Sequence, residues 1–155
     1  MSIKYFFSDT NDGNLAYHVL DFKENADKNR EKLALKWEYN NQDLVYMNQT
    51  HGNNVVIVDE NSPKIIEDCD AIITNAKNLP LMVMVADCIP ILLFDEKVGV
   101  IAAIHAGRNS TFLEIAKKTA DIFIEKFSSK PENISAILGS SIQKCCYEVN
   151  GELAN

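Results

Sequence analysis

The stretch that most constrains the fold is residues 81–107, LMVMVADCIPILLFDEKVGVIAAIHAG. Apolar runs of strand length alternate in it with short polar segments that are typical of turns. The strands expected from these runs are residues 81–86, 91–94 and 98–104, the last two joined as a hairpin by Asp95-Glu96-Lys97. The first run leads to Cys88 and the last to His105. Because functional side chains collect where buried strands open into turns, we expect both residues in one site.

A third reactive residue, His51, lies in the segment Asn48-Gln49-Thr50-His51-Gly52, between apolar runs at residues 43–48 and 54–58. Imidazole and thiolate are ligands that zinc prefers, and three protein ligands leave a fourth position open for catalysis. The intervals between His51, Cys88 and His105 match no local zinc-finger pattern, so the residue types carry this interpretation rather than their spacing. One interpretation is therefore a catalytic metal site formed by these three residues.

The same residues fit a second chemistry that needs no metal. In it Cys88 is a nucleophilic thiolate activated by His105, as in acyl transfer on an amide. Asp87 would act as an acid or base, or would orient a ligand. Both interpretations require the three residues to lie close together, and they differ in whether a metal occupies the thiolate. The other cysteines and the other histidine are interpreted as structural: Cys69, Cys145, Cys146 and His18.

The rest of the chain predicts a mixed α/β domain of the α+β class. The strands expected outside the central stretch are residues 3–7 and 15–20 as a first hairpin, then 43–48, 54–58, 69–74 and 134–138. A helical face begins at Lys23 and should end near residues 40–41. Thr111 and Glu114 form a capping-box pattern for a second helix that continues to Phe127. Its N-terminal amides would lie near the site and suit an anion.

Composition limits the classes of function. A chain of 155 residues with 46% hydrophobic residues fits one globular domain. Its net charge of -7 argues against a nucleic-acid partner, since phosphate backbones are bound by clustered basic residues. The sequence has no secretory signal and no apolar run long enough for a membrane span, so we expect a cytoplasmic protein that has no membrane partner. It also has no glycine-rich phosphate loop, which argues against classical ATP or dinucleotide binding.

Several motifs stand in a characteristic order. They are Asn48-Gln49-Thr50-His51-Gly52, Asp70-Ala71-Ile72-Ile73-Thr74, Ala86-Asp87-Cys88-Ile89-Pro90, His105-Ala106-Gly107, Leu138-Gly139-Ser140-Ser141-Ile142 and Cys146-Tyr147-Glu148-Val149. Together they resemble the YfiH family of laccase-domain, "polyphenol oxidase" or peptidoglycan editing factor proteins, over essentially the whole chain. The resemblance implies one laccase-like domain over residues 1–155, with a fold similar to the catalytic domain of cytotoxic necrotizing factor.

The resemblance also implies a function. It places a zinc ion, with copper as the alternative, on His51, Cys88 and His105. It implies phosphorolysis of adenosine, inosine, guanosine or methylthioadenosine, together with adenosine deamination, so the partners would be a purine nucleoside and phosphate. Alternatives that stay open are a Cys/His hydrolase or peptidoglycan editing factor acting on cell-wall peptides, a copper polyphenol oxidase, and a metal-stabilised binding module without enzyme activity. Three histidines are few for a multicopper relay.

Substrate contacts and two departures complete the expectations. Arg30, Gln49 and Arg108 are the predicted substrate-binding residues, the arginines as phosphate ligands. Family members continue His-Ala-Gly with Trp-Arg-Gly, whereas this chain continues with Arg108-Asn109-Ser110. The chain also ends soon after Tyr147-Glu148-Val149, where family members continue into further strands, so a C-terminally truncated form and a naturally short member both fit.

Overall fold

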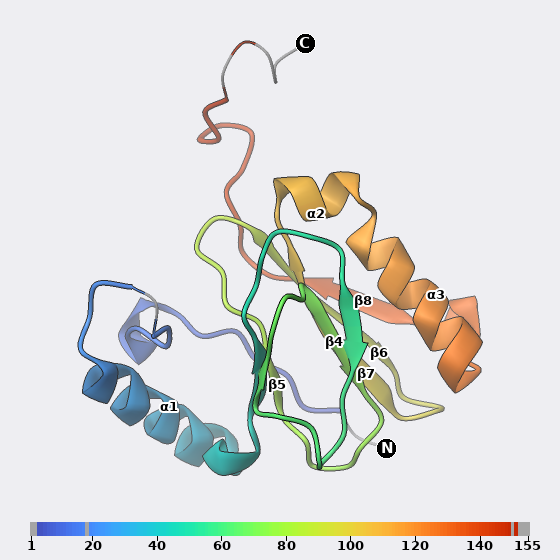
Figure 1. Ribbon diagram of the computed structural model, residues 1–155, viewed down its shortest axis with the longest axis horizontal. Helices are drawn as coiled ribbons and strands as arrows, with labels where there is room; N and C mark the ends of the chain where they lie inside the picture. The colour runs from blue at the N-terminus through green and yellow to red at the C-terminus, as the bar shows by residue number, and fades with distance from the viewer. Residues whose placement is uncertain (1–2, 18, 150, 152–155) are drawn as a thin grey trace.

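A computed structural model describes residues 3–17, 19–149 and 151. The strands are β1 (Val45–Met47), β2 (Val55–Ile57), β3 (Ile65–Ile66), β4 (Ala71–Thr74), β5 (Leu81–Met82), β6 (Ile89–Asp95), β7 (Val100–Ala106) and β8 (Ser135–Leu138). The helices are α1 (Lys23–Trp37), α2 (Arg108–Phe112) and α3 (Ile115–Phe127), with 3-10 turns at Thr10–Asp12, Asn41–Asp43 and Pro131–Asn133. This arrangement confirms the mixed α/β class (Figure 1).

The predicted hairpin of β6 and β7 is the centre of a five-stranded sheet with the order β2-β4-β7-β6-β8. Its strands pair antiparallel from Ile89 opposite Ala106 to Asp95 opposite Val100. The buried Asp95 carboxylate closes the turn, because it accepts hydrogen bonds from the backbone N–H groups of Lys97 and Val98. A second, three-stranded sheet has the order β3-β1-β5 and is parallel throughout.

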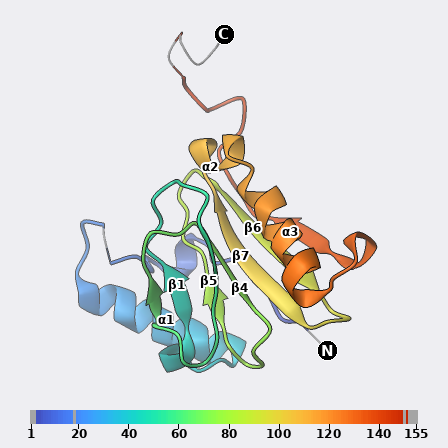
Figure 2. The ribbon, with the colours of Figure 1, turned by 45° about the vertical axis from the view of Figure 1, so that its right-hand side comes forward.

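The two faces of the larger sheet pack against different partners. Successive side chains of a strand point to opposite faces. On β7, Ala102 and Ile104 pack in the core that includes Ile115 and Phe123 of α3. Ala103 packs instead in the second core, with residues of the smaller sheet. By the same alternation, His105 shares the face of Ala103 and is turned away from α3, which Figure 2 shows lying along the larger sheet.

The prediction of a first hairpin is wrong. Residues 3–7 and the described part of 15–20 form no strand, and His18 lies outside the described residues. The segment instead packs through side chains: Phe6 stacks on Trp37 with ring centroids 4.6 Å apart. Arg30 holds the next part, since its Nε donates to the carbonyl oxygen of Leu15 at 2.8 Å. Aromatic packing across the chain has overridden a local β pattern.

Both helices differ from the expectation at one end. α1 ends at Trp37, before residues 40–41, because Glu38 adopts a left-handed conformation with φ 57° and ψ 47°. The prediction of a capping box at Thr111 and Glu114 is also wrong. Glu114 has a left-handed backbone, with φ 57°, and divides the predicted second helix into α2 and α3. The Thr111 hydroxyl donates to the carbonyl oxygen of Gly107 and caps no helix.

The first apolar run of the central stretch forms a much shorter strand than expected. β5 covers only Leu81–Met82, and the chain then bends over residues 86–88. Cys88 therefore lies directly before β6 instead of following a strand. In the described residues no helix has the length and apolar character needed to cross a membrane.

Candidate metal centre

His51, Cys88 and His105 come together from three separate segments. His51 lies in the connection between β1 and β2, Cys88 just before β6, and His105 near the end of β7. One possible ligand atom from each lies within 4.8 Å of the others. The His51 and His105 rings meet edge to face, with centroids 4.7 Å apart, and the Cys88 Sγ lies 3.9 Å from the Nε2 of His51. Two imidazoles and a thiol at this separation fit a zinc or copper ion.

Burial changes steadily across this cluster. His105 is 2% exposed, Cys88 is half-buried and His51 is exposed. The cluster is thus anchored in the sheet on one side and open to solvent on the other. A ligand set with this arrangement leaves access for a substrate or water, as catalytic metal sites require.

Asp70, which the sequence analysis placed in a family motif but gave no role at the site, lies behind the cluster and is fully buried. Its Oδ1 accepts from the His51 backbone N–H at 2.9 Å and lies 2.7 Å from the Nδ1 of His105. Its Oδ2 accepts from the backbone N–H groups of Gly52 and Thr50, at 2.8 and 3.3 Å, and from the Thr50 hydroxyl at 3.2 Å. Two signals in the sequence could have found it: Asp70 opens a family motif, and it is an acidic residue directly before an apolar strand.

Hydrogen bonding decides the ionisation of Asp70. Burial acts to raise the pKa of this carboxyl, but the His105 ring and the backbone N–H groups of Gly52, His51 and Thr50 oppose it. The net pKa lies below its ordinary value, so the carboxyl is ionised near neutral pH. An ionised Asp70 accepts from His105 Nδ1 and leaves Nε2 as the ring atom free to bind a metal.

The His51 backbone is held in an unfavourable conformation. Its φ of 59° lies in the left-handed region, which non-glycine residues rarely occupy. Asp70 fixes the N–H side of this residue, and Asn109 of α2 donates from Nδ2 to its carbonyl oxygen at 2.7 Å. Asn109 belongs to the departure from the family motif, and it fastens α2 to the loop that carries His51.

Gly107 provides the space in which the three side chains meet. A Cβ atom at this position would lie 2.9 Å from Cδ2 of His51, 3.3 Å from the Cys88 Sγ and 3.5 Å from Cε1 of His105. The φ of Gly107 is -69°, so the requirement for glycine is one of space and not of backbone conformation.

The environment of Cys88 weighs against a free nucleophile. Burial, followed by the carboxylates of Asp87 and Asp70, raises the pKa of this thiol. A neutral thiol is a poor nucleophile, whereas a bound cation stabilises the thiolate. The Cys88 sulfur contacts the Nε2 of His51, at 3.9 Å. His105, which the nucleophile interpretation would need as a partner, directs its Nδ1 to Asp70 instead. Cys69 suits the structural role expected of it, because it is fully buried and burial raises its pKa to about 12.

The three predicted substrate-binding residues have different surroundings. Arg108 is exposed and follows Gly107 directly as the first residue of α2. Arg30 is 4% exposed, and its guanidinium lies between the Tyr17 and Tyr46 rings, 4.1 and 4.3 Å from their centroids.

The Gln49 side chain binds the Met84 backbone twice, donating from Nε2 to its oxygen and accepting from its N–H at Oε1. Arg30 reaches the same residue, with its terminal nitrogen 3.7 Å from the Met84 sulfur. Their contacts support the segment that leads to Cys88, and substrate binding by all three residues stays a prediction.

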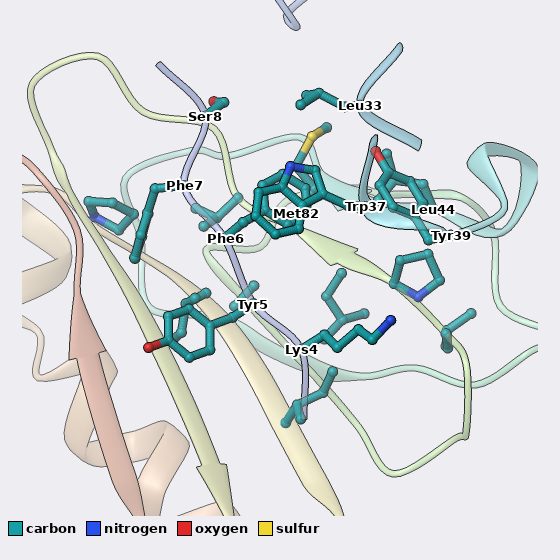
Figure 3. A pocket seen from close by; sticks show the side chains of 18 of the residues that line it. Lys4, Tyr5, Phe6, Phe7, Ser8, Leu33, Trp37, Tyr39, Leu44 and Met82 are labelled. Carbon is teal, nitrogen blue, oxygen red and sulfur yellow. The ribbon is translucent and has the colours of Figure 1, made fainter. Parts of the chain in front are cut away.

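A large hollow lies away from the cluster. A cleft of about 1200 Å³ opens between the N-terminal segment, α1 and the two sheets, and none of the three cluster residues lines it. Figure 3 shows Phe6, Trp37 and Met82 gathered in its middle, with Tyr5 and Phe7 along the segment that crosses it. The cleft is mainly apolar, so the cluster of ligand atoms is the candidate for the chemistry and the cleft is not.

The chain belongs to the family described as multi-copper polyphenol oxidoreductase laccase, whose model matches residues 5–155. A purine nucleoside phosphorylase of Corynebacterium glutamicum is 38% identical over 143 residues, which are 91% of this chain and 58% of that protein. The purine nucleoside phosphorylase YlmD of Bacillus subtilis is 32% identical over 145 residues, covering 88% of this chain and 52% of that protein. The chain thus spans little more than half the length of these relatives.

Two solved structures have the same fold. The Bacillus licheniformis protein YfiH superposes with a TM-score of 0.87 at 29% identity, over 91% of this chain and 56% of that one. YlmD from Geobacillus stearothermophilus has a TM-score of 0.86 at 24% identity, over 90% and 55% of the two chains. The expected YfiH-type fold is therefore confirmed.

Proposed function

We propose that this protein is a metal-dependent purine nucleoside phosphorylase that also deaminates adenosine, with zinc as its metal. The observation that carries the proposal is the convergence of His51, Cys88 and His105 within 4.8 Å. Relatives of 38% and 32% identity that carry the name purine nucleoside phosphorylase support the substrate class. We also infer a cytoplasmic location, where nucleosides and phosphate are available as soluble metabolites.

The chain's own residues have separable parts in this function. His105 Nε2, the Cys88 thiolate and one nitrogen of His51 would hold the metal, which when bound polarises an oxygen of water or phosphate. Exposed Arg108 beside Gly107 would hold phosphate through charge-assisted hydrogen bonds. The open side at His51 would admit the nucleoside, while buried Asp70 keeps His105 oriented.

Metal content and turnover test the proposal together. Purified protein should contain close to one equivalent of zinc. It should convert adenosine and phosphate to adenine and ribose 1-phosphate and, in a parallel reaction, adenosine and water to inosine and ammonia. Cys88→Ala should lose the metal and reduce turnover by at least about 100-fold, since it removes one of three ligands. Cys145→Ala, at an exposed thiol outside the cluster, is the matched control and should behave like the wild type.

The outcomes separate the alternatives. Stoichiometric copper with oxidation of phenols would replace the proposal by the activity that the family description names. Metal-free protein that cleaves an amide through Cys88 would indicate the hydrolase. Bound zinc that raises the melting temperature, without nucleoside turnover, would indicate a binding module.

A further inference from the structure

One buried carboxylate touches both segments that carry the histidine ligands. Asp70 Oδ1 lies between the His51 backbone N–H at 2.9 Å and the His105 Nδ1 at 2.7 Å. Its Oδ2 receives two more backbone N–H groups and a hydroxyl, those of Gly52 and Thr50. His105 also donates its backbone N–H to the Asp70 carbonyl oxygen at 2.7 Å, so strand pairing fixes the position of the two residues.

The surrounding donors decide the direction of the bond to His105. A backbone N–H can only donate, and each oxygen of Asp70 already accepts from at least one. A carboxylate has only acceptors, so the Nδ1 of His105 must carry the proton that it shares with Oδ1. The neutral ring then has an unprotonated Nε2, which is the form that binds a metal.

We infer that Asp70 is a positioning residue that selects the Nδ1–H tautomer of His105 and holds the left-handed backbone of His51. The inference rests on the proposed function, because the tautomer has a consequence there only when His105 binds a metal. The Asp70 side chain thus sets the geometry of His51 and His105 together, although the two lie far apart in the sequence. Hydrogen-bond partners of this kind behind a histidine ligand typically account for about 10- to 100-fold in metal affinity.

Asp95 provides a matched contrast. It is also fully buried, and it is the last residue of β6, in the sheet whose strand β4 begins just after Asp70. Its Oδ1 accepts from the backbone N–H groups of Lys97 and Val98, and neither His51 nor His105 bonds to it. A carboxylate that only stabilises a turn should behave like Asp95, whereas a positioning residue should also change the state of the His105 ring.

The substitution Asp70→Asn keeps the size of the side chain but places an amide N–H₂ among donors. If the amide nitrogen faces His105, Nδ1 must become the acceptor, and the proton moves to Nε2. If it faces the other way, it opposes the N–H of Gly52 and the donors of Thr50 and displaces the loop that carries His51. Either arrangement damages the cluster.

The test is the ¹⁵N spectrum of the imidazole rings in metal-free protein at about pH 8, where histidine is neutral. Wild type and Asp95→Asn should show His105, assigned with a His105→Gln spectrum, as the Nδ1–H tautomer. Asp70→Asn should show either a large Nε2–H population at His105 or a displaced His51 resonance. Zinc titration should then give an affinity lowered about 10- to 100-fold in Asp70→Asn and changed less than about 3-fold in Asp95→Asn.

A wild-type His105 that is mainly the Nε2–H tautomer would overturn the inference without any variant, so the test survives a failure of Asp70→Asn to fold. Wild-type tautomer and zinc affinity in a folded Asp70→Asn would also overturn it. The spectra need neither metal nor nucleoside. An absence of nucleoside turnover would therefore remove the proposed function and leave the assignment of the tautomer intact.

Discussion

The cluster of His51, Cys88 and His105 and the aromatic cleft are built on different principles. The cluster is small, and directional bonds hold its parts: Asp70 to both histidine segments, and Asn109 to the His51 carbonyl. The cleft is far larger, at about 1200 Å³, and ring packing such as Phe6 on Trp37 holds its walls. Hydrogen bonds fix angles and protonation, whereas apolar packing fixes mainly distance and volume.

The difference indicates how to find the chemistry in such a fold. A large apolar cleft is a reasonable first choice for an active site. Here that choice would miss His51, Cys88 and His105, because none of them lines the cleft. Reactive side chains with defined orientation are the better guide, and substitutions in the two regions should separate metal affinity from stability.

The largest effect is expected from filling the space at Gly107. In Gly107→Ala the new Cβ would stand 2.9 Å from the His51 ring and 3.3 Å from the Cys88 sulfur, so the ligands must move apart. Zinc affinity should fall about 10- to 100-fold, as measured by competition with a chromogenic chelator. Gly52→Ala is the control, because its Cβ would meet only ordinary contacts at 3.6 Å or more, and equal losses in both variants would refute this account.

A substitution in the cleft should lower stability and leave zinc affinity unchanged. Trp37→Ala removes the ring that stacks on Phe6, and we expect the free energy of unfolding to fall by about 2 kcal/mol in urea denaturation followed by circular dichroism. Zinc affinity should stay within about 2-fold of the wild type, since no bond to the cluster is lost. Leu35→Ala, at a site 82% exposed on the same helix, should leave both quantities unchanged.

A smaller effect on zinc affinity is expected from removing the hydrogen bond that joins α2 to the loop that carries His51. Asn109→Ala removes the 2.7 Å hydrogen bond to the His51 carbonyl oxygen, worth about 1 kcal/mol. Zinc affinity should fall about 5-fold in isothermal titration, since the left-handed loop loses one of its two anchors. Asn53→Ala breaks a similar bond to the Leu113 carbonyl. If it weakened zinc binding as much, the Asn109 bond would have no special part.

Local patterns in the sequence predicted much of the framework. The β6–β7 hairpin follows from two apolar runs around a polar turn, and α1 from a face repeated every three or four residues. The residue types of His51, Cys88 and His105 indicated that they meet, and the family motifs around them supported this. Each of these signals is local, since it can be read from the residues themselves without knowing their partners elsewhere in the chain.

Features that depend on distant partners escaped prediction. Asp70 meets His105 only because β4 and β7 pair antiparallel, with Ala71 opposite Ile104. The break between α2 and α3 at Glu114 has no helix-breaking residue to announce it. The N-terminal segment has the β-prone pattern of a strand, but its aromatic rings are held by α1 and the sheets.

The left-handed histidine has a consequence for how such a chain can evolve. A φ of 59° at His51 costs about 1–2 kcal/mol in a non-glycine residue, while asparagine tolerates it more readily. Selection for folding alone would favour His51→Asn, which relieves the backbone and abolishes a ligand. Under the proposed function, a lineage that keeps histidine here trades stability for metal binding. A His51→Asn protein that binds no metal but has a higher melting temperature would make that trade-off visible.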